Sequence, residues 1–170
     1  MTYVTRPGEE KDIQSLLEIY NDAVENSTST FDLEPQTTDQ RSAWFKEHTG
    51  EHPLVVVEDD GLVVGYATLS AFRDKPAYSK TAESSVYVRN SHRGKGIGRA
   101  AMDAIISKAR ELGFHTMVAG IVPPNEASVR LHMGLGFEHV ADFREVGFKF
   151  GRWLDVRFYQ LALESAEVTK

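Results

Sequence analysis

The most constraining feature of this chain is a strand-like segment that passes through a glycine-rich turn directly into a helix-like segment. It covers Val86, Tyr87, Val88, Arg89, Asn90, Ser91, His92, Arg93, Gly94, Lys95, Gly96, Ile97, Gly98 and Arg99. Glycines permit backbone conformations closed to other residues and let a ligand approach the main chain. Free N–H groups at the start of a helix then attract anions, and Arg93, Lys95 and Arg99 add positive charge. The segment predicts a phosphate-binding turn.

Glycine-rich turns also occur in three other settings. A Walker A loop would need serine or threonine after Lys95, where Gly96 stands. Residues 96–101 formally match a dinucleotide-binding fingerprint, but that motif opens an early βαβ unit with an acidic residue near the next strand. The next strand-like segment, 115–121, has no acidic residue. A turn without any ligand is the third alternative.

The rest of the chain alternates between the two hydrophobic periods. Period-2 segments predict strands, period-3.6 segments predict helices, and together they indicate a mixed sheet in an α/β arrangement. We expect strands at 3–6, 54–58, 62–72, 81–88, 115–122, 137 onward and 152–163. We expect helices from 12, at 38–48, at 96–112 and from an Asn125 cap to about 135, a loop at 26–35, a tight turn at Asp59-Asp60-Gly61 and a frayed tail over 164–170.

Bulk composition narrows the class of protein. With 170 residues, 41% of them hydrophobic, the chain suits a single folded domain over 1–170. A net charge of −6 argues against nucleic acid as a partner and weakly against an anionic membrane. Without cysteine there is no thiolate metal site, and the histidines show no metal-ligand pattern, so we expect no metal. The absence of a signal-peptide pattern and of a membrane-length apolar run predicts a cytoplasmic protein.

Several motifs together resemble one enzyme family. Arg93 to Gly98 is similar to the Arg/Gln-x-x-Gly-x-Gly signature of the GNAT acetyltransferase superfamily. Further segments look like its phosphinothricin and methionine sulfone (sulfoximine) acetyltransferase branch: 29–31, 77–78, 83–88, 125–128, 131–132, 135–137 and 149–155. The resemblance implies a GNAT-type acyl-CoA N-acyltransferase fold, with a mixed, mostly antiparallel central sheet and helices on both faces. It also implies acetyl-CoA as co-substrate and a homodimer, for which Trp153 and Phe158 would offer apolar surface.

Acetyl transfer from a thioester to an amine needs proton removal, a polarised carbonyl and a leaving thiolate. Glu83 could be an ordinary surface residue of a strand, but partial burial would raise its pKa and make it a usable base. In the resembled branch the matching glutamate is the base proposed, and the matching histidine, here His132, has been assigned a catalytic part. His132 could equally just hydrogen-bond a strand.

The resemblance also implies the ligand contacts. Backbone groups of Val86, Tyr87 and Val88 would pair with the pantetheine arm, and the turn would bind the pyrophosphate through residues 93–99. Asn125 and Ser128 would contact the arm from the other side, although Asn125 alone could be a helix cap. Arg73 would hold a substrate carboxylate, and Phe31 and Tyr78 would form apolar walls.

The expected function is acetyl transfer to the α-amine of a small amino-acid-like substrate: methionine sulfone, methionine sulfoximine or phosphinothricin. Two alternatives stay open. One is acetylation of another amine, such as a peptide N-terminus, a polyamine or an antibiotic. The other is a non-catalytic acyl-CoA-binding module, which would need the turn but neither Glu83 nor His132.

Overall fold

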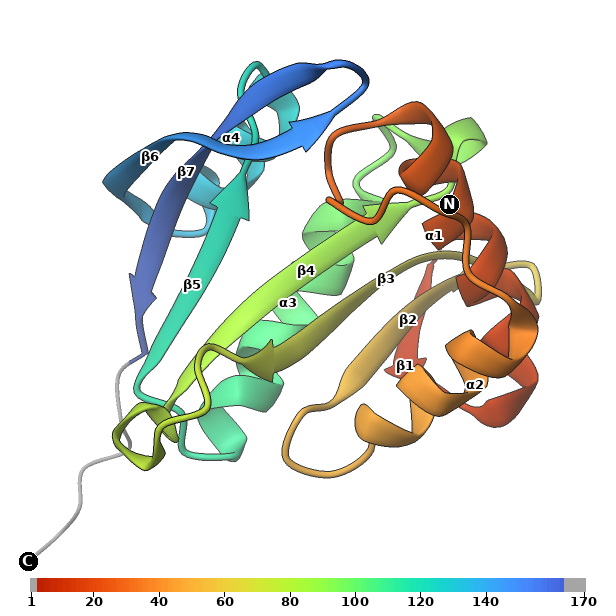
Figure 1. Ribbon diagram of the computed structural model, residues 1–170. Coiled ribbons are helices and arrows are strands. Elements are labelled where there is room, and N and C mark those ends of the chain that lie inside the picture. Colours follow the sequence, from red (N-terminus) through yellow and green to blue (C-terminus); the bar gives the residue numbers. More distant parts are fainter. Residues whose placement is uncertain (1–2, 164–170) are drawn as a thin grey trace, which may run out of the picture.

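The computed structural model describes residues 3–163, so the tail expected at 164–170 lies outside the described residues (Figure 1). Its strands are β1 (Val4–Pro7), β2 (Leu54–Asp59), β3 (Leu62–Ala71), β4 (Thr81–Val88), β5 (Thr116–Ile121), β6 (Glu138–Lys149) and β7 (Arg152–Ala162). Its helices are α1 (Ile13–Asn26), α2 (Thr38–Glu47), α3 (Ile97–Glu111) and α4 (Glu126–Gly134), with short 3₁₀ turns at Glu10–Asp12, Pro76–Tyr78 and Asn90–His92. The predicted order of elements is confirmed.

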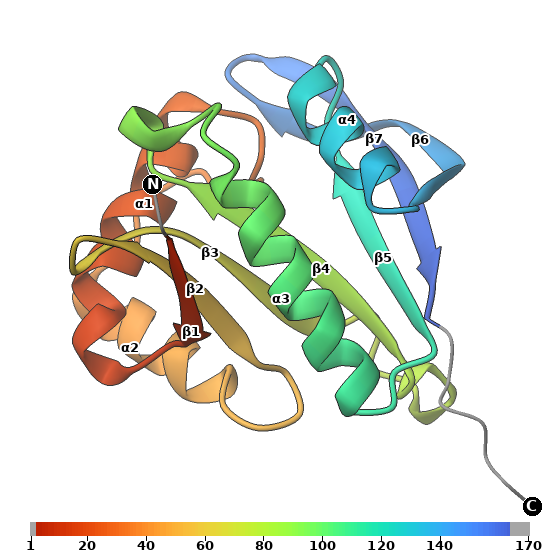
Figure 2. The ribbon, with the colours of Figure 1, turned by 180° about the vertical axis from the view of Figure 1, so that it is seen from behind.

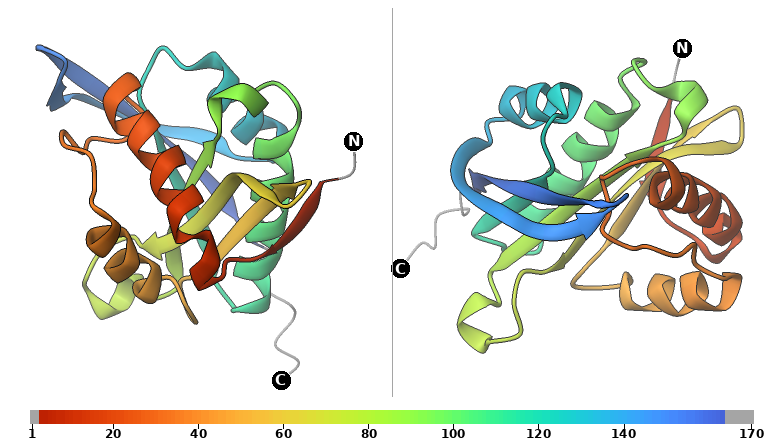
Figure 3. Two further views of the ribbon diagram at one scale, coloured as in Figure 1. Left: turned by 90° about the vertical axis from the view of Figure 1, so that its right-hand side faces the viewer. Right: turned by 45° about the horizontal axis from the view of Figure 1, so that its top comes forward.

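The strands form one sheet in the order β1-β2-β3-β4-β5-β7-β6. Every neighbouring pair is antiparallel except β4 and β5. Helices α1 and α2 lie on one face and α3 and α4 on the other (Figures 1 and 2), and the layers are also visible from the side (Figure 3, left). This confirms the mixed, mostly antiparallel α/β fold. It rules out the dinucleotide alternative, which needs a parallel sheet around its glycine turn.

Two apolar cores follow from the two helical layers. Beneath α3, residues such as Ile97, Ala101 and Ile105 pack against β3, β4 and β5, as the helical spacing predicts. Beneath α1 and α2, Leu16 and Ile19 pack against β2 and β3. Because successive side chains of a strand point to opposite faces, each strand between these layers contributes to both cores.

The β2–β3 connection confirms the predicted tight turn. Asp60 and Gly61 form a two-residue loop, and both have positive φ, +48° and +81°. Such turns match the twist of a hairpin, and the Asp-Gly pair tolerates the left-handed conformation that they require.

Candidate active site

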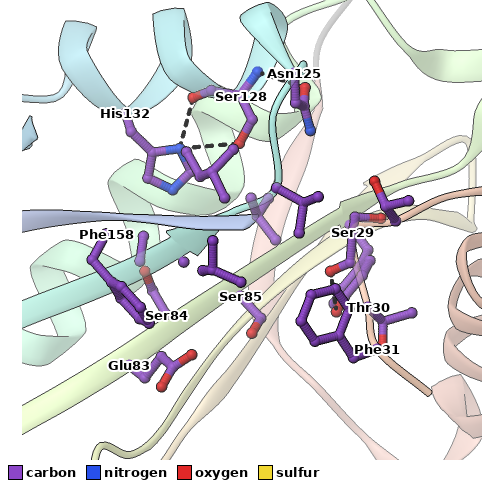
Figure 4. Close-up of a pocket in the computed structure, with 18 residues that line it drawn as sticks. Ser29, Thr30, Phe31, Glu83, Ser84, Ser85, Asn125, Ser128, His132 and Phe158 are labelled. Carbon is purple, nitrogen blue, oxygen red and sulfur yellow. Dashed lines mark hydrogen bonds between the residues drawn. The ribbon is translucent and has the colours of Figure 1, made fainter. Parts of the chain in front are cut away.

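The site arises where two neighbouring strands of the sheet diverge. β4 and β5 pair over only three residues, from Thr81 with Thr116 to Glu83 with Val118. Beyond that point the strands separate (Figure 1), and a pocket of about 380 Å³ opens between them. The α1–α2 loop lines it at residues 28–31, and α4 lines it with Ser128 and His132 (Figure 4). The pocket is therefore bounded from both faces of the sheet.

The backbone of β4 is available to a ligand along this opening. The Arg89 N–H donates to the Val64 carbonyl at 2.8 Å, so odd-numbered residues of β4 direct their backbone groups towards β3. By the alternation of an antiparallel ladder, Ser84, Val86 and Val88 direct theirs towards β5. The β4–β5 ladder ends at Glu83. An extended chain could therefore pair with β4 there, as the pantetheine expectation requires.

Glu83 lies at the point of divergence and lines the pocket. Burial raises the pKa of its carboxyl, and the charge of Arg73 lowers that pKa in part. A carboxylate with a raised pKa accepts a proton more readily than an exposed one. The position and the surroundings agree with what a general base needs.

His132 is buried in α4, with 3% of its surface exposed, and it faces the pocket. Its Nδ1 lies 2.8 Å from the Ser128 carbonyl oxygen, which can only accept, so Nδ1 carries the ring proton. Burial lowers the pKa of His132 and favours the neutral ring. Nε2 is therefore a hydrogen-bond acceptor, and it points into the pocket (Figure 4). The hydrogen bond of His132 is therefore made within α4 and not to a strand, and its catalytic part stays a prediction.

Asn125 caps α4, because its side-chain oxygen accepts the Ser128 backbone N–H at 3.2 Å. The predicted cap is confirmed. Asn125 and Ser128 both line the pocket, so the geometry permits the additional coenzyme contact, which stays a prediction.

The glycine-rich turn follows the C-terminal end of β4, which is the end away from Glu83. Gly94 and Gly96 have φ of +74° and +81°, and Gly96 is the N-cap of α3. Gly98 allows close packing instead, since a Cβ at this position would lie 3.3 Å from the Leu131 side chain of α4.

The side chains of the turn divide into solvent-facing and structural ones. Arg93, Lys95 and Arg99 are exposed. Arg99 pairs with Asp103 at 3.0 Å, and Ile97 is buried in the core. Ile97 could therefore contact a ligand only through its backbone.

The three predicted substrate residues do not lie together. Phe31 and Glu83 both line the pocket. Arg73 and Tyr78 are exposed in the β3–β4 connection outside the lining, where both contact Phe72. Arg73 still influences Glu83 electrostatically, so its guanidinium belongs to the same neighbourhood.

Two residues of the pocket wall, and one buried lysine that contacts that wall, were missed in the sequence. Ser84 and Phe158 line it, and the buried Lys149 donates to the Thr30 carbonyl at 2.9 Å, tying β6 to the α1–α2 loop. Phe158 was expected at an apolar surface; it is instead half-buried in the pocket wall, so that expectation is wrong. Ser84 lies in the segment 83–88 that resembles the acetyltransferase branch, and that resemblance was its only signal in the sequence.

Comparison with known proteins decides the family. A family profile described as an acetyltransferase (GNAT) domain matches residues 6–157. The chain belongs to the GNAT acetyltransferase family.

Three relatives of this GNAT chain are informative. An L-methionine sulfoximine/L-methionine sulfone acetyltransferase of Salmonella typhimurium is 42% identical over 94% of each chain. A phosphinothricin N-acetyltransferase of Streptomyces coelicolor is 42% identical over 93% of this chain and 95% of its own. A Salmonella typhimurium protein solved with its cofactor acetyl-CoA has a TM-score of 0.94 at 39% identity, covering 100% of this chain and 99% of its own. The resemblance inferred from the motifs is confirmed.

Proposed function

We propose that this enzyme transfers acetyl from acetyl-CoA to the α-amine of methionine sulfone, methionine sulfoximine or phosphinothricin. The observation that carries the proposal is the divergence of β4 and β5, with Glu83 at its apex and the glycine turn beyond the far end of β4. The names of the relatives support the acceptor class, and the relative solved with acetyl-CoA supports the donor.

The coenzyme would lie along the opening. The turn at 93–99 would hold the pyrophosphate, and the arm would pair with Val86 and Val88 and run back towards Glu83. The amine would enter beside Phe31 and lose its proton to Glu83, directly or through a water, as its nitrogen attacks the thioester carbonyl. Asn125 and Ser128 would position the arm from the α4 side.

Arg73 would bind the carboxylate of the amino acid. A guanidinium suits a carboxylate, and Arg73 is exposed in the β3–β4 connection, near enough to Glu83 to alter its pKa. Tyr78, which packs on the same Phe72 ring, would add apolar contact beside it.

The test is an assay for released thiol with acetyl-CoA and a panel of amines, run on the wild type and on Glu83→Gln. We expect turnover of the three amino acids, and a fall in kcat of roughly 10²–10⁴-fold in the variant, because a general base is lost. Glu111→Gln makes the same change at the exposed end of α3 and serves as the control. Near-normal turnover in Glu83→Gln would show that the base is elsewhere.

The panel also separates the alternatives. It includes a peptide N-terminus, a polyamine and an amine-bearing antibiotic, and the cationic Arg73 disfavours a polyamine. If one of these amines is acetylated and the three amino acids are not, the acceptor is that class of amine and the amino-acid assignment is wrong. A protein that binds acetyl-CoA but acetylates no amine would be the non-catalytic module.

Assembly and location complete the proposal. Exposed apolar side chains gather on β6, β7 and the turn between them, and we propose that this surface forms a homodimer.

We place the enzyme in the cytoplasm, where acetyl-CoA is available. Among the described residues, no helix is long and apolar enough to span a membrane.

A further inference from the structure

Ser84 is a polar side chain whose burial needs an explanation. It is 6% exposed, and its hydroxyl oxygen is buried without a hydrogen-bond partner among residues 3–163. A buried hydroxyl that forms no hydrogen bond lowers the stability of a fold. Ser84 is one of the residues that line the pocket, so a ligand bound there is the partner that the structure offers for this hydroxyl.

Ser84 and Glu83 face opposite sides of the sheet. Ala82 and Val86 belong to the core beneath α3, so Ser84, which has the same parity, points to the α3 and α4 side. Tyr87 packs towards α1 and α2, so Glu83 points to that side. His132 approaches the pocket from α4, on the Ser84 side (Figure 4).

The proposed coenzyme position brings the thioester between the side chains of Glu83 and Ser84. From Val88 back to Ser84, the open edge of β4 spans about 13 Å of extended strand. An arm that starts at the glycine turn and pairs along this edge brings its sulfur end to the apex of the opening. There Glu83 would face the entering amine, and Ser84 and His132 would face the departing sulfur.

Hydrogen-bonding capacity then separates the roles of Ser84 and His132. The neutral His132 ring offers an acceptor at Nε2, so it cannot donate to a thiolate. The Ser84 hydroxyl can donate. A thiol group satisfies both, because its S–H donates to Nε2 while its sulfur accepts from Ser84.

We infer that Ser84 is a further catalytic residue, which donates a hydrogen bond to the coenzyme sulfur as it leaves; this rests on the proposed function. The C–N bond forms and the C–S bond breaks, with the sulfur taking the electron pair as a thiolate. The amine proton passes to Glu83 and then to water, and the thiolate takes a proton from water to become the thiol. The Ser84 hydroxyl keeps its own proton throughout.

The first test measures binding without any acceptor amine. Coenzyme A and desulfo-coenzyme A, which lacks the sulfur, are titrated calorimetrically into the wild type and into Ser84→Ala. The hydrogen bond from Ser84 predicts that the preference for coenzyme A over the desulfo compound is about 3- to 10-fold larger in the wild type than in Ser84→Ala. The weaker hydrogen bond from the S–H to His132 is retained in both proteins, so Ser84→Ala should keep only a residual preference. Ser85→Ala changes a serine on the opposite face of the same strand and should keep the preference.

The second test measures turnover and folding together. Ser84→Ala should lower kcat about 10- to 100-fold, since a donor to developing charge is lost. Its thermal unfolding midpoint should be unchanged or higher, because an unpartnered buried hydroxyl is removed.

The two tests distinguish this inference from the proposed function. A wild type that binds the two coenzymes equally, or a Ser84→Ala protein that keeps the full wild-type preference, overturns the role of Ser84. A preference that depends on Ser84 in a protein that acetylates none of the amino acids supports that role and overturns the acceptor assignment instead.

Discussion

At the scale of single residues, Glu83 and Arg73 form an electrostatic pair that pH can probe. The general base must be ionised, so the acid limb of the rate profile follows the pKa of Glu83, which burial raises above its ordinary value. The positive charge of Arg73 lowers that pKa in part and so extends activity towards lower pH.

Removing the Arg73 charge should therefore move the acid limb of kcat/KM to higher pH. We expect this in Arg73→Gln, while Arg73→Lys, which keeps the charge, should leave the limb near its wild-type position. Because Arg73 is exposed, added salt should reduce the difference. The measurement is kcat/KM against pH at low and high ionic strength. Superimposable limbs in the wild type and Arg73→Gln would show that the guanidinium does not act on the base.

Residue roles were predictable from the sequence where a motif carried them, and less so where neighbours distant in the sequence decide them. Glu83, His132 and Asn125 were identified in this way, and all three line one pocket. Arg41 was not singled out. It is 1% exposed, with its guanidinium 4.1 Å from the Tyr20 ring and 4.0 Å from the Trp44 ring. Aromatic faces can hold a cation in a core. Trp44 lies three residues from Arg41 on α2, but only the packing of α1 on α2 brings Tyr20 to it.

At the scale of elements, the hydrophobic period predicted β4 with its observed limits and α3 to within one residue at each end. The divergence of β4 from β5 could not be predicted in the same way. The residues of β4 keep a strand-like pattern on either side of Glu83, and those of β5 do so on either side of its partner Val118. No change in residue type marks the point where the pairing of the two strands stops.

The glycine turn gives a prediction with an internal control. Gly96 and Gly61 share a φ of +81°, and a Cβ at either would meet open space. Replacing either with alanine should thus cost similar backbone strain, about 1 kcal/mol of unfolding free energy. Only Gly96→Ala should also raise the KM for acetyl-CoA, because it disturbs the N–H groups that would hold the pyrophosphate.

Chemical denaturation and initial rates of the two variants test this. An unchanged KM in a folded Gly96→Ala protein would remove the turn from the coenzyme site. An equal rise in both variants would mean that strain alone, transmitted through the sheet, is responsible.

At the scale of the whole molecule, apolar surface is distributed unevenly. Val146, Phe148, Phe150 and Trp153 are each more than half exposed, and all lie on β6, β7 or the turn between them. Strand β6 is also an edge of the sheet. An exposed apolar edge favours association with another chain. Trp153 is one of the two residues, with Phe158, that were expected to offer apolar surface for the dimer implied by the family resemblance.

We therefore expect a dimer in solution that depends on this surface. Light scattering should give twice the mass of the chain at concentrations on the order of 10 micromolar, within the range of ordinary protein association energies. Trp153→Lys should give a monomer with nearly the wild-type unfolding free energy, because the side chain is 60% exposed in the single chain. Leu62→Lys makes the same kind of change at the β2–β3 turn, where the side chain is 43% exposed, and should remain dimeric. A wild type that stays monomeric at this concentration would refute the dimer, and a Trp153→Lys protein that stays dimeric would place the interface elsewhere.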